Sequence, residues 1–441
     1  MAALADRLLA AALAPERAAW HAASQKDAAA TDPVAIVVPS IVQGQAISEN
    51  ALRLTAALLG DGQRVHFLIT EEQTARTPPC AFLRYPDVPS SREGAPLLSR
   101  LVEMAAAASG RLTLAMLATR GTYLDAAREA ITHLRSLHPR TCLFFGNASC
   151  PITLAMAWGR VATRQVSLSM GVPLVVAGVD AIIFNNPRKC LRDGPALEAA
   201  ARIAGRTHRC LSVETSGGDA SGSSIVTTRR ELGVPEHASL LAQASNALAK
   251  RMCGTLNAST FAHDLARFMA APGREDVWWI GIGPWDAASA DAARVLGAID
   301  SVSPALRNRM RFLGPRENVR ADISAADLFL NEYPEGGGNS VIEAMGCAVP
   351  VVAMRAGERH AECIGADLVG DDAIPSASPR DYWALAARWC DDAPQRRAAG
   401  TRQRTRALAH LDYAAVMRQY LGILRDLDTA AASGPIKTPT V

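Results

Sequence analysis

Short apolar runs alternate with helical patterns along almost the whole chain, and this alternation limits the fold more than any other feature. In the first half, Val34–Pro39 and Val65–Thr70 have the residues of buried strands, and the helical stretch Ala51–Leu59 lies between them. The pattern returns later, with strands predicted at Ser239–Gln243 and Val277–Gly281. Alternating strands and helices build parallel sheets that helices cover on both faces. The sequence therefore predicts an α/β protein.

A polar, glycine-rich segment separates the two series of strands and helices. Ser216–Ser224 reads SGGDASGSS and has no apolar periodicity, which is typical of a linker. We therefore expect two Rossmann-like domains facing each other across a cleft, at the strand ends where such folds bind ligands. The expected divisions are residues 1–215 for the N-terminal domain, 216–237 for the linker, 238–400 for the C-terminal domain, 401–428 for a final helix and 429–441 for a disordered tail.

Composition excludes several classes of protein. The chain has 441 residues, 49% of them hydrophobic and 20% charged, which describes an ordinary globular protein of two or three domains. Its net charge of +3 is too small to indicate a nucleic-acid partner. No apolar run approaches the roughly 18 residues of a membrane span. Asp6 and Arg7 interrupt the apolar N-terminal stretch, which indicates an amphipathic helix rather than a secretory signal.

Cysteine and histidine spacing gives no sign of a metal centre. The nine cysteines include no C-x-x-C pair, which favours reduced thiols and a cytoplasmic location. His133 and His138 lie five residues apart, and His360 and Cys363 three apart, without further ligands at zinc-like spacing. We expect neither a metal nor a cofactor.

The most specific motif follows a strand end in the second half of the chain. Asp327–Leu330 is the apolar strand end, Gly336–Gly338 form a turn, and a helical run begins at Ser340. Such a turn leaves backbone N–H groups at a helix N-terminus, which bind phosphate. Glu335 and Glu343 bracket the turn eight residues apart. Amides for a diphosphate beside carboxylates for hydroxyl groups suit a sugar nucleotide.

This segment resembles the signature of group 1 nucleotide-sugar glycosyltransferases, E-G-x-G-x-x-x-x-E-A-M-x-x-G-x-P-V-V. Glu335–Met345 and Pro350–Val352 match it, whereas Gly346-Cys347-Ala348 places the glycine early. The resemblance implies the GT-B fold, with the donor in the C-terminal domain and the acceptor in the N-terminal domain. It also implies that Glu335 contacts the donor sugar and that Glu343 binds the ribose. Further matches in the same order are Trp279–Pro284, Arg311–Pro315 and Ser324–Asp327.

Other segments are similar to the catalytic region of O-linked N-acetylglucosamine transferases and bacterial N-glycosyltransferases. Ser245–Lys250 resembles their F-N-x-x-x-K, and Arg160–Val166 resembles R-L-A-P-x-Q-V. Ser169–Pro173 resembles the following L-G-H-P, with Val172 in place of the histidine. By this resemblance Lys250 stabilises the charge that develops on the leaving diphosphate. The glutamate pair favours a retaining reaction and the lysine an inverting one, so the stereochemistry stays open.

The expected enzyme is a hexosyl- or N-acetylhexosaminyltransferase that uses a UDP-sugar without metal. Its acceptor stays open among protein, peptide and glycan. The alternatives are a sugar-nucleotide epimerase of the same fold and an inactive binding or scaffold protein. Three residues also have alternative interpretations: a solvated helix residue for Lys250, a surface carboxylate for Glu362 and a simple turn for Gly44. The predicted site comprises Glu335 and Lys250 as catalytic residues, Glu343, Gly336, Gly337, Gly338, Asn339, Ser340, Asn246, Gly283 and Glu362 on the donor side, and Gly44, Asn147 and Gly171 on the acceptor side.

Overall fold

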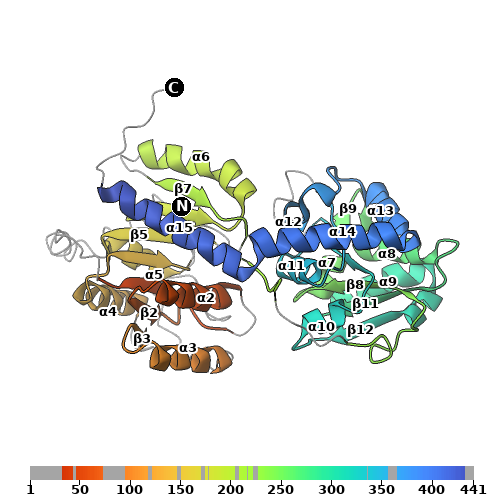
Figure 1. The fold of residues 1–441 in the computed structure, drawn as a ribbon, viewed down its shortest axis with the longest axis horizontal. Coiled ribbons are helices and arrows are strands. Elements are labelled where there is room, and N and C mark those ends of the chain that lie inside the picture. The colour runs from red at the N-terminus through yellow and green to blue at the C-terminus, as the bar shows by residue number, and fades with distance from the viewer. Residues whose placement is uncertain are drawn as a thin grey trace. The chain divides into compact units, whose positions relative to one another are not determined.

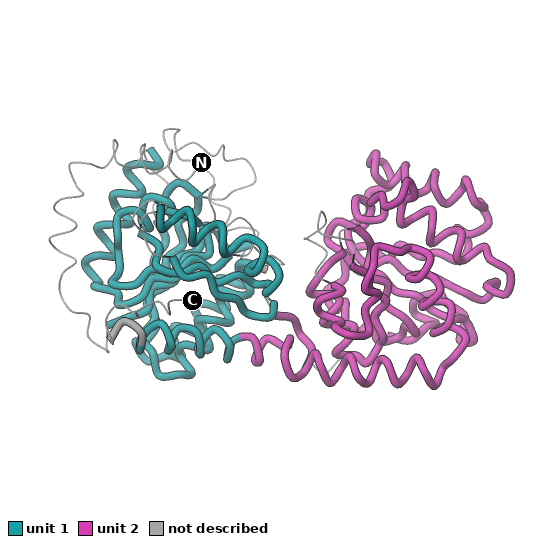
Figure 2. The backbone as a smooth tube through the Cα atoms, turned by 90° about the horizontal axis from the view of Figure 1, so that it is seen from above, with its two compact units in different colours: residues 1–216, 417–441 teal, residues 217–416 magenta. Residues whose placement is uncertain are grey.

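The structure is a computed structural model in which the chain forms two compact units. Unit 1 comprises Met1–Ser216 and Met417–Val441, and unit 2 comprises Gly217–Val416 (Figure 2). The residues described are 32–42, 46–72, 95–117, 122–146, 150–169, 174–176, 178–203, 208–215, 217–221, 227–334, 336–355 and 365–432. The predicted α/β class is confirmed, because each unit has a parallel sheet flanked by helices (Figure 1).

Unit 1 is built on a seven-stranded sheet of order β3-β2-β1-β4-β5-β6-β7. Every strand pair in it is parallel. The strands are β1 (Val34–Val38), β2 (Val65–Ile69), β3 (Leu112–Met116), β4 (Thr141–Phe144), β5 (Arg164–Ser169), β6 (Ala181–Phe184) and β7 (Arg209–Ser212). All five residues of β1 are buried, as expected of a central strand covered on both faces.

The helices of unit 1 are α2 (Ala46–Gly60), α3 (Ala95–Ala107), α4 (Tyr123–Ser136), α5 (Pro151–Gly159), α6 (Pro187–Ile203) and the later part of α15 (Tyr413–Ala432). Thr122 and Asp125 form a capping box at the start of α4. Ser48 lies inside α2, which already begins at Ala46, and its hydroxyl accepts a hydrogen bond from Val42 N at 2.9 Å.

Helix α15 is fastened to unit 1 by polar contacts along its length. Arg425 pairs with Asp61 and Asp428 pairs with Arg164. Gln419 accepts a hydrogen bond from the backbone of residue 214 at 2.9 Å. A helix from the C-terminal end of the chain therefore completes the N-terminal unit, which explains why unit 1 is discontinuous in sequence.

Unit 2 has a five-stranded parallel sheet of order β12-β11-β8-β13-β14. Its strands are β8 (Ser239–Ala244), β11 (Val277–Ile282), β12 (Met310–Gly314), β13 (Leu328–Leu330) and β14 (Val351–Val352). The hairpin β9 (Thr255–Leu256) and β10 (Ser259–Thr260) lies outside this sheet. Its helices are α7 (Leu248–Met252), α8 (Phe261–Ala270), α9 (Ala290–Val302), α10 (Val319–Ile323), α11 (Asn339–Gly346), α12 (Gly365–Val369), α13 (Pro379–Asp391), α14 (Ala393–Arg406) and the start of α15.

Two apolar clusters lie on the two faces of the unit 2 sheet. Leu241 and Leu328 belong to a cluster with residues of α7, α8, α9 and α13. Their sequence neighbours Leu240 and Phe329 belong to a second cluster with residues of α11 and α12. This alternation is what a strand buried on both faces requires. Within the described ranges, no helix combines the length and apolar character of a membrane span.

The part of the expected linker that the structure describes is packed against unit 2. Asp412 accepts hydrogen bonds from the backbone of Ala220 at 3.2 Å and Ser221 at 3.1 Å. Ala220 is buried, and the Arg320 guanidinium donates to the Asp219 carbonyl. Residues 217–221 therefore have fixed partners on α10 and at the start of α15.

Candidate functional site

The expected donor residues gather at the carboxyl edge of the unit 2 sheet. After β8 and β11, Ser245 N donates to Ile282 O at 3.0 Å, and Gly283 N donates to Gly314 O at 2.9 Å. Gly283 has a φ of +136°, and a Cβ there would lie 1.9 Å from the Ser245 carbonyl oxygen. Only glycine permits this approach, so Gly283 brings three strand ends together.

The glycine turn lies against the end of β13. A Cβ on Gly336 would lie 2.2 Å from Asn331 Oδ1, and one on Gly365 would lie 1.9 Å from the same atom. Asn331 Nδ2 donates to Gly337 O at 3.0 Å. The turn is therefore held by Asn331, a residue that the sequence analysis did not single out.

The start of α11 faces the same edge without a side-chain cap. Gly338 is the N-cap residue and provides no side-chain hydrogen bond, and Asn339 is the first helical residue. Ser340 Oγ donates to the Ala244 carbonyl at 3.0 Å, which ties the helix start to the end of β8. The first N–H groups of α11 lack a side-chain cap, and the helix dipole there favours a bound anion.

In unit 1, the protein's own carboxylate binds the N-terminus of the helix α5. Glu72 follows β2 and is buried beside the start of α5. Its carboxylate accepts hydrogen bonds from Ile152 N at 2.5 Å, Thr153 N at 3.1 Å and Thr70 Oγ1 at 2.8 Å. A carboxylate thus occupies this helix N-terminus, whereas no described residue provides a side-chain cap at the start of α11.

Lys250 and Asn246 lie near the end of β8. Asn246 precedes α7 and Lys250 is within it, and both residues are exposed. A Cβ on Gly254, just beyond α7, would lie 2.9 Å from Pro334 Cδ, so the end of α7 abuts the segment before the glycine turn. The next residue, Arg251, has its Nε 3.7 Å from Glu332 Oε1. Arg251 of α7 therefore lies beside the carboxyl edge, and Lys250 precedes it on the same short helix.

Glu343 is half-buried in α11, near Asp219 and Arg320. Burial of its carboxyl group, together with the negative charge of Asp219, raises the pKa of Glu343 to about 7, and Arg320 opposes that rise. The Arg320 Nη1 and Asp219 Oδ1 atoms lie 3.8 Å apart. Glu343 can therefore act as a hydrogen-bond acceptor for a hydroxyl group, and its charge changes near neutral pH.

Glu332 is the strongest site feature that sequence reasoning missed. It is 1% exposed, and neither carboxylate oxygen accepts a hydrogen bond from another described residue. Burial raises its pKa to about 7, which the Arg251 charge and the residue's own backbone N–H partly oppose. Asn331 Oδ1 is likewise buried without a partner. The sequence contains only a weak signal for this residue, since it lies three positions before Glu335 in a segment noted for the glycines.

Five of the expected site residues lie outside the described residues. They are Glu335 and Glu362 on the donor side and Gly44, Asn147 and Gly171 on the acceptor side. His360 lies outside as well. Their roles therefore remain predictions.

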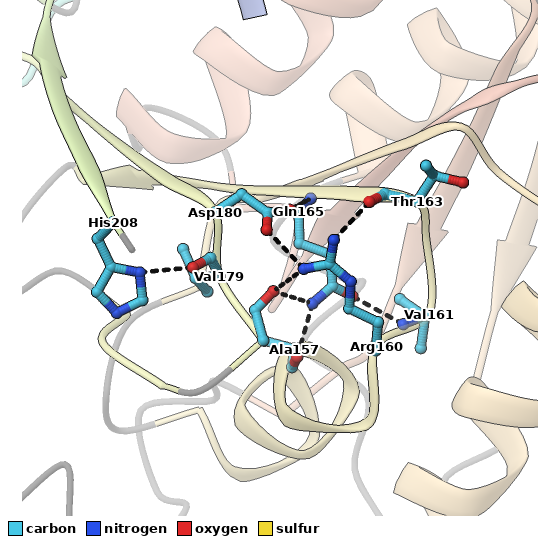
Figure 3. Close-up of polar contacts among 9 residues, drawn as sticks. Ala157, Arg160, Val161, Thr163, Gln165, Val179, Asp180 and His208 are labelled. Atoms are coloured by element: carbon cyan, nitrogen blue, oxygen red, sulfur yellow. Dashed lines mark hydrogen bonds and ion pairs between the residues drawn. The ribbon is translucent and has the colours of Figure 1, made fainter. Parts of the chain in front are cut away.

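The Arg160–Val166 segment holds loops of unit 1 together (Figure 3). Arg160 Nη1 donates to Asp180 Oδ1 at 2.6 Å, and its Nη2 donates to the Thr163 carbonyl at 2.6 Å. Gln165 is fully buried, accepts from Val161 N at 2.7 Å and donates to the Gly178 carbonyl at 2.7 Å. These contacts satisfy backbone groups around β5, so Arg160 and Gln165 hold the backbone loops next to this strand in place.

No group of three or more His, Cys, Asp or Glu residues could hold a metal ion in the part of the chain that the structure describes. His133 lies near His66. The Nε2 atoms of His133 and His66 are 3.0 Å apart, and His66 Nδ1 lies 2.8 Å from Thr113 Oγ1. Burial and the neighbouring His133 lower the pKa of His66 to about 4, so the buried ring is neutral at pH 7.

Comparison with known proteins agrees with this geometry. Residues 251–390 match the model of the family described as glycosyl transferases group 1. No curated protein matches the chain by sequence. The structure is similar to a glycosyltransferase from Rickettsia africae, with a TM-score of 0.63, 11% identity and coverage of 90% of this chain and 99% of that chain.

Two further solved structures have the same fold. HepE from Anabaena in complex with UDP has a TM-score of 0.60 at 14% identity, over 89% of this chain and 100% of that one. A mutant O-GlcNAc transferase from Thermobaculum terrenum has a TM-score of 0.56 at 13% identity, over 91% of this chain and 69% of that one. The predicted GT-B fold is thus confirmed, and the matching family model lies within unit 2.

Proposed function

We propose that this chain transfers a sugar from a nucleotide diphosphate donor, a UDP-sugar, to an acceptor without a metal ion. The observation that carries the proposal is the uncapped start of α11 at the carboxyl edge of unit 2, close to the end of β8. A diphosphate supplies the anion that this helix start favours. Lys250, which follows that strand on α7, adds a cation on the same side.

The reaction needs charge stabilisation at the diphosphate. The bond between the anomeric carbon and the diphosphate oxygen breaks, and its electron pair stays on the diphosphate. The acceptor nucleophile forms the new bond to that carbon and loses its proton. The backbone N–H groups of α11 and the Lys250 ammonium are suited to the negative charge that develops on the leaving group. By family resemblance Glu335 contacts the sugar and Glu343 the ribose.

Structural neighbours support the choice of nucleotide. HepE from Anabaena has been crystallised with UDP and with UDP-glucose. The likeness to an O-GlcNAc transferase keeps an N-acetylhexosamine donor and a protein or peptide acceptor as candidates beside a hexose and a glycan. We place the acceptor in unit 1, by resemblance to the family.

A thermal-shift panel tests this function. The full-length protein is heated with UDP-, GDP-, ADP- and TDP-sugars, with and without EDTA. A donor at ~100 times its dissociation constant should stabilise the protein by about 2.7 kcal/mol. We expect a UDP-sugar to give this stabilisation in EDTA. If no nucleotide sugar stabilises the protein, the donor-site proposal is wrong, and stabilisation that EDTA abolishes contradicts the metal-independent reaction.

A further inference from the structure

Glu332 is a buried carboxylate that no other described residue satisfies by a hydrogen bond. It is 1% exposed, and neither oxygen accepts a hydrogen bond from another residue in the described ranges. The nearby Arg251 Nε lies 3.7 Å from Oε1, which is too long for a hydrogen bond but close enough to offset the charge. Burying a charged acceptor without hydrogen bonds costs free energy, so a group of this kind calls for an explanation.

The residue lies where a donor ligand is expected. It follows β13 by two positions and precedes the glycine turn. Its neighbour Asn331 holds that turn through Gly337 and keeps its own Oδ1 without a partner. The partner cation Arg251 is adjacent in sequence to Lys250 on α7. Three acceptor oxygens without partners therefore lie between the turn and the basic helix.

The chemistry of these oxygens selects one part of the donor. Diphosphate oxygens accept hydrogen bonds and cannot donate to a carboxylate. Sugar hydroxyl groups and an N-acetyl amide are donors, and a carboxylate with two free oxygens can bind two of them at once. The charge of Arg251 keeps such a carboxylate from repelling the diphosphate.

We propose that Glu332 is a specificity-determining residue that accepts hydrogen bonds from the transferred sugar of the donor, with Arg251 neutralising its charge. This inference rests on the proposed function, and it adds a residue outside the glutamate pair of the family signature. Glu332 would then raise the affinity for a nucleotide sugar without changing the affinity for the nucleotide alone.

Calorimetric titration of UDP, UDP-glucose and UDP-N-acetylglucosamine tests this inference. Wild type and Glu332→Gln are compared as full-length proteins. Glutamine keeps the size of the side chain and replaces one acceptor oxygen with a donor. The affinity for the UDP-sugar should fall by about tenfold or more, since a hydrogen bond to a charged group is worth ~1.5–3 kcal/mol, while the affinity for UDP stays within about twofold.

Asp327→Asn is a matched control at the other end of the same strand, just before β13. Asp327 precedes β13 and pairs with Arg229 at 2.8 Å and with Arg396 at 3.1 Å. Its substitution should lower the melting temperature without changing the ratio of UDP-sugar to UDP affinity. Glu332→Asp, which keeps the charge but is shorter by one methylene, should lose affinity for the UDP-sugar as Glu332→Gln does.

Each outcome bears on one claim. Equal loss of UDP and UDP-sugar affinity in Glu332→Gln would assign the residue to the nucleotide, and unchanged affinity for both would assign it to structure alone. Wild-type affinity of Glu332→Asp for the UDP-sugar would mean that only the charge opposite Arg251 matters. Any of these results overturns the inference but leaves the proposed function standing. If wild type binds none of the three ligands, the proposed function fails, and the inference fails with it.

Discussion

Glu332 should make the protein less stable at neutral pH than at acid pH, and Glu332→Gln should remove this dependence. Burial raises the pKa of Glu332 from 4.5 to about 7 in the folded protein. Between these values the unfolded chain releases the proton and the folded chain keeps it. The contribution to stability is therefore fully present below pH 4.5 and is lost as the pH rises through about 7.

The magnitude follows from the two pKa values. The difference between 4.5 and about 7, at about 1.4 kcal/mol per pKa unit, amounts to about 3 kcal/mol. Because the residue is 1% exposed, solvent screening reduces this little. The free energy of unfolding of Glu332→Gln, relative to wild type, should therefore rise by about 3 kcal/mol between pH 4 and pH 8.

Urea denaturation at several pH values, followed by tryptophan fluorescence, measures this difference. Five of the seven tryptophans lie in unit 2, at positions 278, 279, 285, 383 and 389, so the signal reports mainly that unit. Glu231→Gln is the control, because hydrogen bonds from Thr228 lower the pKa of the exposed Glu231 below 4.5 and therefore predict no loss of stability between pH 4.5 and pH 8. A difference between Glu332→Gln and wild type that is constant from pH 4 to pH 8 would refute the reasoning.

Three further predictions concern the donor site and the helix behind it. Lys250→Ala should weaken binding of UDP about tenfold or more and leave uridine nearly unchanged, as measured by calorimetry, and equal losses would place Lys250 away from the phosphates. Glu335→Gln should lower turnover by ~10²-fold, whereas Glu343→Ala should mainly raise KM for the donor, and steady-state kinetics with the opposite pattern would reverse the two roles. Ala348→Gly should raise the free energy of unfolding by about 0.5–1 kcal/mol, and a loss of stability in urea denaturation would contradict the strain inferred there.

The positions of the strands in the sequence could be predicted because buried parallel strands have a simple signature. The strands predicted at Val34–Pro39 and Val65–Thr70 are β1 and β2, each one residue shorter than predicted. Both are buried along their whole length, so local composition determines them. The final helix, expected at residues 401–428, instead begins at Tyr413 as α15, and α14 before it is a separate helix. Asp392 caps α14 by accepting a hydrogen bond from Gln395 N at 2.9 Å. The sequence Asp-Ala-Pro is typical of such a helix start.

Features that depend on distant partners could not be predicted. Residues 217–221 have the composition of a linker, but Asp412, about 190 positions later, accepts hydrogen bonds from their backbone. Glu332 in turn lies opposite Arg251, a residue of α7 about 80 positions earlier in the chain. Composition gives neither pairing, because both arise only when the sheet brings the segments together. A buried acceptor without partners is therefore visible only in three dimensions, even when its neighbours form a known motif.

The early position of the glycine in the signature segment, at Gly346 instead of residue 348, has a physical explanation. The family glycine position is taken by Ala348, which has a φ of +58° just after α11. An alanine in this left-handed conformation costs ~1–2 kcal/mol, and glycine is favoured there after a helix. The early glycine, Gly346, has another constraint, since a Cβ there would lie 2.6 Å from the Ala220 carbonyl oxygen. The chain therefore has glycine at position 346, where residues 217–221 pack on α11. The strained left-handed backbone conformation lies two residues later, at Ala348. Ala348→Gly should relieve that strain without disturbing the packing, whereas a side chain at Gly346 would push the 217–221 segment away from the helix that carries Glu343.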